Sequence, residues 1–380
     1  LNWSVLAQVA RQVFQFSIGV LLARLLTPEA YGLIGMIAVF TGFAGIFKDI
    51  GLGSALVQKQ DAEPIHFTTV FWTNVGMGVL LTILFAAGSP FVASFYDEPL
   101  LQPLTAFLAL NFLIDSFGIV QRMILNKELD FRRLAYLQIV TMLVSGPVAV
   151  SLALYGYGVW SLAVQTVLSS VLSVVLLWWM SDWRPSFAFS KSALGDLWAF
   201  SSNLLGFSTL NYWVRNADNL LIGRFLGSGA LGLYTKSYSL MLLPLRSISS
   251  TIGRVMFPAF STIQHDHERI ARVYLKMTRT IALVTFPMML GLIAVARPFV
   301  LGVFGPQWED MIPVLQILST VGMIQSIGTL NGNLFKATGR TDLQLRVGGT
   351  IGIVGVGAIA LGIWLGTVEA VALCYAVFSF

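Results

Sequence analysis

Amide and charged side chains recur inside segments of this sequence that are otherwise apolar. In residues 2–26 they lie three or four positions apart, which places them on one face of a helix. These residues are Gln8, Arg11, Gln12 and Gln15. A second polar set lies 200 residues further on, in 197–226, and includes Asn211, Arg215 and Asp218. Polar stripes inside a membrane face a bundle interior or a wet cavity and not lipid, so the pattern predicts that the two helices face each other across a central polar cavity.

Further charged residues lie within the apolar segments, and cations outnumber carboxylates there. The additional cations are Lys48, Lys236 and Arg246, and the additional carboxylates are Asp49 and Asp115. A net positive interior suits an anionic substrate. Asp49 and Asp115 are the candidates for coupling transport to a proton or sodium gradient.

Structural roles stay open for the same side chains. Arg215 and Asp218 are three positions apart, a spacing that allows an ion pair on one helix. Lys48 lies near the end of its segment, from which its ammonium group could reach the membrane interface. The glutamines of residues 2–26 could instead hydrogen-bond neighbouring helices.

The elements that carry these residues are membrane-spanning helices. Hydrophobic residues make up 56% of the 380-residue chain, charged residues make up only 11%, and the mean hydropathy is +0.78. Each long apolar run is sufficient to cross the roughly 30 Å hydrocarbon core as a helix. We expect eleven spans and a partial twelfth, at 2–26, 32–57, 67–95, 100–120, 134–154, 158–180, 197–226, 230–258, 275–296, 310–334, 346–366 and 368–380. Both ends fall inside apolar runs and read as trimmed.

Basic residues are distributed unevenly among the connections between these spans. Thirteen of the 23 lie in alternate connections, whereas the other connections hold only Arg24, Arg224 and Arg297. The excess of Lys and Arg on the cytoplasmic side of membrane proteins therefore predicts that both termini are cytoplasmic.

The two halves of the chain repeat one another. Residues 22–33 (LARLLTPEAYGL) align with 222–233 (IGRFLGSGALGL), and the tripeptide Pro-Phe-Val occurs at 90–92 and 298–300. These anchors occur in the same order, which predicts two six-helix bundles, 1–182 and 183–380. Both have the same orientation, as in one known transporter architecture.

Several classes of activity lack the residues they need. The nearest approach to an ATP-binding loop, at 227–232, has Leu233 where lysine is required. The three histidines lie in connections, which predicts no metal site, no cofactor and no enzyme activity. The basic segments 121–134 and 263–275 favour anionic membrane lipid over nucleic acid as a partner.

Four segments resemble one family of membrane proteins. They are ARLLTPEAYG at 23–32, KDIGLGSALVQ at 48–58, DNLLIGRFLG at 218–227 and FGPQW at 304–308. They resemble the Wzx-type flippases of bacterial polysaccharide and lipopolysaccharide, which include colanic-acid exporters. This family belongs to the MOP superfamily with the MATE drug exporters and the lipid II flippase.

The resemblance implies a function and a V-shaped fold of two bundles. It implies that alternating access moves undecaprenyl-diphosphate-linked oligosaccharide across the bacterial inner membrane, through the cationic cavity described above. Polysaccharide polymerase and glycosyltransferases are then possible partners. Two alternatives stay open, a cation-coupled MATE-type drug exporter and a non-transporting component of a polysaccharide assembly complex.

Overall fold

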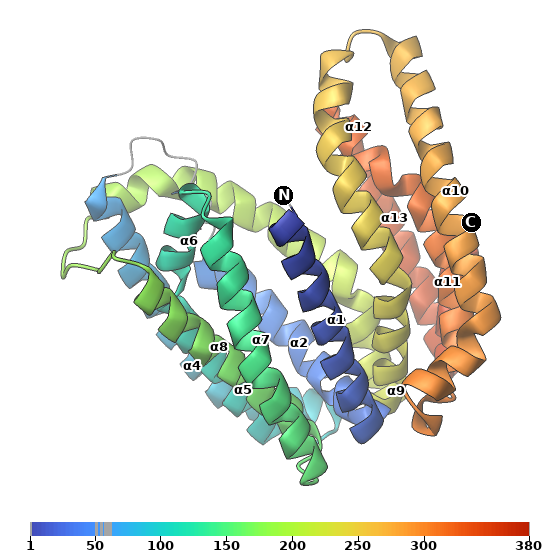
Figure 1. Ribbon diagram of the computed structural model, residues 1–380, viewed down its shortest axis with the longest axis horizontal. Helices are drawn as coiled ribbons and strands as arrows, with labels where there is room; N and C mark the ends of the chain where they lie inside the picture. The colour runs from blue at the N-terminus through green and yellow to red at the C-terminus, as the bar shows by residue number, and fades with distance from the viewer. Residues whose placement is uncertain (1, 50–51, 54–55, 57–62, 380) are drawn as a thin grey trace. The chain divides into compact units, whose positions relative to one another are not determined.

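The computed structural model describes residues 2–49, 52–53, 56 and 63–379, and for stretches such as 2–11, 196–208 and 246–251 it describes the backbone alone. Every regular element among these residues is a helix (Figure 1). The helices are α1 (Asn2–Leu25), α2 (Pro28–Asp49), α4 (Pro64–Tyr96), α5 (Leu101–Ser116), α6 (Ile119–Lys127), α7 (Phe131–Leu154), α8 (Val159–Met180), α9 (Lys191–Thr262), α10 (His267–Val303), η1 (Pro306–Trp308), α11 (Met311–Ile327), η2 (Gly328–Leu330), α12 (Asn331–Ala337), α13 (Thr341–Trp364) and α14 (Val368–Ser379).

The chain is a multi-span membrane protein. In the part of the chain that the structure describes, seven helices are long and apolar enough to cross a membrane, and an eighth span results if α5 and α6, which are bent by 46°, are counted together. Each of the expected spans overlaps a helix in its described residues, although the total of twelve stays a prediction. Spans 197–226 and 230–258 both fall within α9, whose helical geometry breaks at Gly227 with φ 86° and ψ 179°. Only glycine adopts this conformation readily, so the residue marks the turn between two helices.

Packing divides the chain into an N-terminal unit, Leu1–Trp213, and a C-terminal unit, Val214–Phe380. The boundary falls inside α9. The internal repeat predicts a different division, at 182/183. That division follows the symmetry of the sequence, whereas the boundary at 213/214 follows packing contacts, so the division at 182/183 stays a prediction.

In the N-terminal unit, α5 packs against both α4 and α8, while α7 packs between α8 and α1 (Figure 1). The α4–α5 pair is close because Gly78 has no side chain. A Cβ there would lie 2.8 Å from the Phe112 carbonyl oxygen. The first part of α9 is fastened to α2 by the Tyr212 hydroxyl, which donates to the Val39 carbonyl at 2.7 Å.

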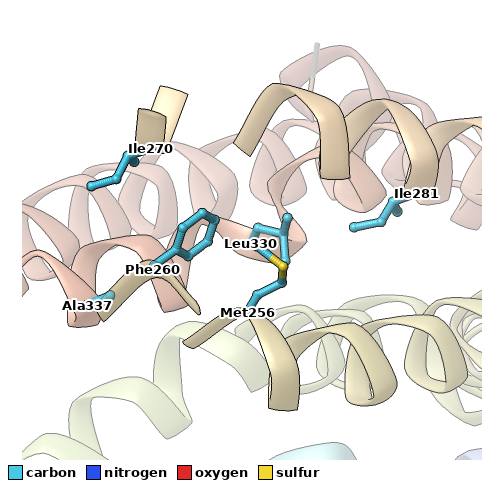
Figure 2. Packing of buried hydrophobic residues seen from close by; sticks show 6 residues of the cluster. All are labelled: Met256, Phe260, Ile270, Ile281, Leu330 and Ala337. Atoms are coloured by element: carbon cyan, nitrogen blue, oxygen red, sulfur yellow. The ribbon is translucent and has the colours of Figure 1, made fainter. Parts of the chain in front are cut away.

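In the C-terminal unit, an apolar cluster joins the end of α9 to α10 and α12. Figure 2 shows Met256 and Phe260 of α9 beside Leu330, with Ile270 and Ile281 contributed by α10. The eleven-residue spacing of the two isoleucines places them on one helix face. Burial of this face fixes α10 against its neighbours and leaves its other face, which carries Arg272 and Lys276, exposed.

The contact between α13 and α14 gives a test of the packing. A Cβ on Gly362 would lie 2.8 Å from the backbone nitrogen of Val371, whereas a Cβ on Gly357 of the same helix would meet nothing within 4 Å. We expect Gly362→Ala to destabilise the protein by about 1–3 kcal/mol, because backbone must move to admit the methyl group. Thermal unfolding of purified protein measures the effect. Gly357→Ala is the matched control, and equal melting temperatures for the two variants would contradict this packing.

Candidate functional site

An ion pair lies inside the N-terminal unit. Lys48 Nζ of α2 lies 2.9 Å from Asp115 Oδ2 of α5, and the two side chains are 24% and 31% exposed. The ends of two helices that are distant in sequence are brought together by the packing of α2 on α5. Lys48 is therefore neutralised across the unit, and the alternative in which it extends alone to the membrane interface is wrong.

The pair borders a cavity of about 330 Å³ between α2, α5 and α8. Asn111, one helical turn before Asp115, lines the same cavity, as their i, i+4 spacing requires. Three hydroxyl side chains complete the polar lining, namely Thr41, Thr166 and Ser170.

The polar stripe of α1 is described in part. The helix covers Asn2–Leu25, so all four stripe positions share one face. Gln12 and Gln15 are exposed, whereas the side chains of Gln8 and Arg11 lie outside the described residues. The same holds for the side chains of Asn211, Arg246 and Asp49. Their predicted roles stay predictions.

Asp218 lies within the C-terminal unit, and its hydrogen bonds differ from those that the sequence suggests. Its carboxylate accepts from the Tyr234 hydroxyl at 3.2 Å and from the backbone N–H of Asn219 at 2.8 Å. Arg215 is exposed and does not pair with it, so the predicted ion pair between the two is wrong. Asp218 is only partly exposed and bonds instead to Tyr234, which lies further along α9. Among the described residues, no basic side chain pairs with Asp218.

Aromatic and amide side chains extend this polar core. The Tyr234 ring stacks on Tyr238, with centroids 6.0 Å apart, one helical turn along α9. From α11, Gln325 Nε2 donates to the Tyr375 hydroxyl of α14 at 3.1 Å. A partly buried carboxylate is thus surrounded by phenols and an amide contributed by three helices.

Lys236 is held by aromatic rings of the FGPQW segment. Its Nζ lies 5.3 Å from the ring centroid of Phe304 and 5.8 Å from that of Trp308, both of which are buried. These distances are typical of cation–π contacts. The ammonium group is therefore engaged with the protein's own rings, and a role in ligand binding would require it to leave them.

The structure thus brings Lys48 and Asp115 together in the N-terminal unit and places Asp218 and Lys236 in separate contacts of the C-terminal unit. Gln12, Gln15 and Arg215, in contrast, are exposed. Sequence reasoning missed the phenols at 234, 238 and 375 and the hydroxyls of α8. Two tyrosines at i, i+4 inside an apolar segment were a usable signal for the first set. Nothing in the sequence marked Thr166 or Ser170, since hydroxyl residues are common in membrane helices.

The helical architecture matches that of solved transporters. A multidrug resistance MATE family transporter of the MOP superfamily, in its inward-facing conformation, superposes with a TM-score of 0.71 at 16% identity, over 97% of this chain and 91% of that one. The lipid II flippase MurJ, inward closed, gives 0.80 at 13% identity, over 100% and 85%. The expected likeness in fold to these transporters is confirmed.

A family model described as polysaccharide biosynthesis protein matches residues 21–313, and the chain belongs to this family. Teichuronic acid biosynthesis protein TuaB of Bacillus subtilis is 32% identical over 100% of this chain and 79% of its own length. Lipopolysaccharide biosynthesis protein WzxC of Escherichia coli is 29% identical over 91% and 70%. Succinoglycan biosynthesis transport protein ExoT of Rhizobium meliloti is 30% identical over 98% and 77%. The resemblance to polysaccharide exporters is confirmed.

The ion pair of the N-terminal unit gives a second test. We expect Lys48→Met to destabilise the protein by about 3 kcal/mol, since it leaves Asp115 as an uncompensated charge away from bulk water. The double variant Lys48→Met/Asp115→Leu removes both charges and should recover most of that loss. Melting temperatures of the purified variants report the difference. A double variant no more stable than the single one would show that the pair is not a coupled unit.

Proposed function

We propose that the protein is a flippase that moves undecaprenyl-diphosphate-linked oligosaccharide from the cytoplasmic to the periplasmic leaflet by alternating access. The observation that carries this proposal is the match of residues 21–313 to a polysaccharide biosynthesis family, in a chain with a transporter fold. Charged groups within membrane-spanning helices mark substrate or ion routes. Transport, and not catalysis, accounts for their presence.

The chemistry of the substrate fits the described polar residues. Arg215 is exposed although it lies in a spanning segment, and a guanidinium group binds a diphosphate through paired hydrogen bonds. Gln12 and Gln15 are exposed on α1 and suit sugar hydroxyls. The proposal also assigns Gln8, Arg11, Asn211 and Arg246 to this role, on their sequence positions.

The proposal places the protein in the bacterial inner membrane with both termini in the cytoplasm. Anionic membrane lipid would contact its basic cytoplasmic segments. The partners under this proposal are polysaccharide polymerase and glycosyltransferases, which act on the same lipid-linked glycan. Nucleic acid is not a proposed partner.

Coupling to a proton or sodium gradient requires a carboxylate that changes its charge during the cycle. Asp115 is already neutralised by Lys48. Among the described residues, the hydrogen-bond partners of the Asp218 carboxylate are a phenol and a backbone N–H. An ionised carboxylate without a basic partner is costly inside a membrane protein, and a proton or sodium ion would relieve that cost. We therefore favour Asp218 over Asp115 as the coupling residue.

Complementation of a flippase-deficient bacterium tests the function. We expect the wild type to restore surface polysaccharide, and Arg215→Ala and Arg11→Ala to reduce it at matched membrane expression. Loss of one charge-assisted hydrogen bond costs about 1.5–3 kcal/mol, or roughly ten- to a hundredfold in affinity. Arg297→Ala is the control, because Arg297 is exposed and pairs with Glu309. Failure of the wild type to complement, together with drug resistance on expression, would instead indicate a multidrug exporter.

Transport into proteoliposomes under imposed pH or sodium gradients tests the coupling. We expect Asp218→Asn, which keeps the shape and an acceptor oxygen, to lose the gradient dependence that the wild type shows. Asp342→Asn is the control, since Asp342 is more than half exposed and pairs with Arg340. Unchanged gradient dependence in Asp218→Asn would remove Asp218 from the mechanism.

A further inference from the structure

The cavity of the N-terminal unit contains a polar atom that the described residues leave without a partner. Asn111 Oδ1 is buried and accepts no hydrogen bond from any residue in the described part of the chain. Ser170, which is partly exposed, adds a hydroxyl to the lining of the same cavity. An unsatisfied buried polar atom costs about 1–3 kcal/mol. A ligand that donates and accepts hydrogen bonds would recover that cost.

Other polar groups in the cavity can form further hydrogen bonds. Thr41 and Thr166 donate their hydroxyl protons to carbonyls of their own helices, so their oxygens can still accept. Lys48 uses one of three donors on Asp115, whose carboxylate retains free lone pairs. The cavity therefore offers both donors and acceptors, contributed by three helices.

The charges select the kind of ligand. Lys48 repels a cation and Asp115 repels an anion, and together they leave the cavity close to neutral. Opposite charges 2.9 Å apart form a strong local dipole that hydroxyl groups can bridge. A neutral molecule rich in hydroxyls meets both conditions.

The size of the cavity and its apolar lining residues narrow the class of ligand further. The volume of about 330 Å³ equals roughly ten water molecules and lies at the small end of ligand sites, so a single ion would not fill it. Ile34, Ile37, Leu108 and Phe112 add apolar surface to the lining of the same cavity. A sugar ring combines the same two kinds of surface, with hydroxyls at its edge and C–H bonds on its face.

We propose that the cavity between α2, α5 and α8 binds one uncharged sugar ring of the transported glycan. This inference rests on the proposed flippase function and adds a subsite within the N-terminal unit, apart from the arginine that would hold the diphosphate. Asn111, Ser170 and the Lys48–Asp115 pair bind the ring hydroxyls, and Phe112 covers the C–H face. The subsite contributes to the choice of glycan.

Protection of an engineered thiol tests the proposal in the purified full-length chain. Replacing the single cysteine, Cys374→Ala, gives a background for Ala38→Cys, which lines the cavity without removing a polar group. The probes are neutral methyl glycosides of the common hexoses and deoxyhexoses. A glycoside at four times its Kd should slow labelling by a small thiosulfonate reagent about fivefold, because only the free fraction reacts. Thr280→Cys on α10, outside this unit, should show no protection.

A second variant tests whether protection by the glycoside depends on the polar lining residues. Asn111→Leu keeps the volume and removes the unpaired amide, so it should abolish protection by the glycoside while the thiol still reacts. Labelling that no glycoside slows, or a thiol that does not react at all, would overturn the subsite. Protection by sodium chloride and not by glycosides would show an ion site and overturn it as well. The flippase function itself would stand in each case if the wild type restores surface polysaccharide.

Discussion

The structure depends on the need of charged groups inside a membrane protein to find a partner within the protein. Hydrocarbon supplies no hydrogen bonds, so a charge that faces it is expensive. The described charges meet this need in three ways. Lys48 pairs with Asp115, Asp218 accepts from a tyrosine hydroxyl, and Lys236 lies against two aromatic rings. Each arrangement fixes the helices that contribute to it.

These partnerships give the two units different chemical characters. The N-terminal unit holds a neutralised ion pair beside a polar cavity. The C-terminal unit holds a carboxylate among phenols and an amide. A neutral, hydroxyl-lined cavity suits recognition of a sugar, whereas a carboxylate without a basic partner suits the reversible binding of a proton or sodium ion. Substrate recognition and coupling would then be divided between the units.

Polar contacts that lie within one unit are compatible with the conformational change of a transport cycle. The polar contacts described here lie within a unit, so each can persist while a transporter alternates between states. The break at Gly227 and the tyrosine contact of Tyr212 with Val39 mark where α9 is bent and where it is fastened. Glycine at 227 leaves the chain free to turn without disturbing the helices on either side.

The class of the protein could be predicted from the sequence, because apolar runs of this length are typical of membrane-spanning helices and because the motifs at 23–32 and 304–308 resemble those of an exporter family. The sequence also located Asn111 and Asp115 on one face, since helical periodicity is local. Only the tertiary structure decided which side chains meet. Lys48 pairs with Asp115, which is 67 positions away in the sequence. Asp218 accepts a hydrogen bond from Tyr234 and does not pair with Arg215. Pairing depends on how helices are rotated against each other, and that rotation is set by packing of the whole unit, which short-range spacing does not encode.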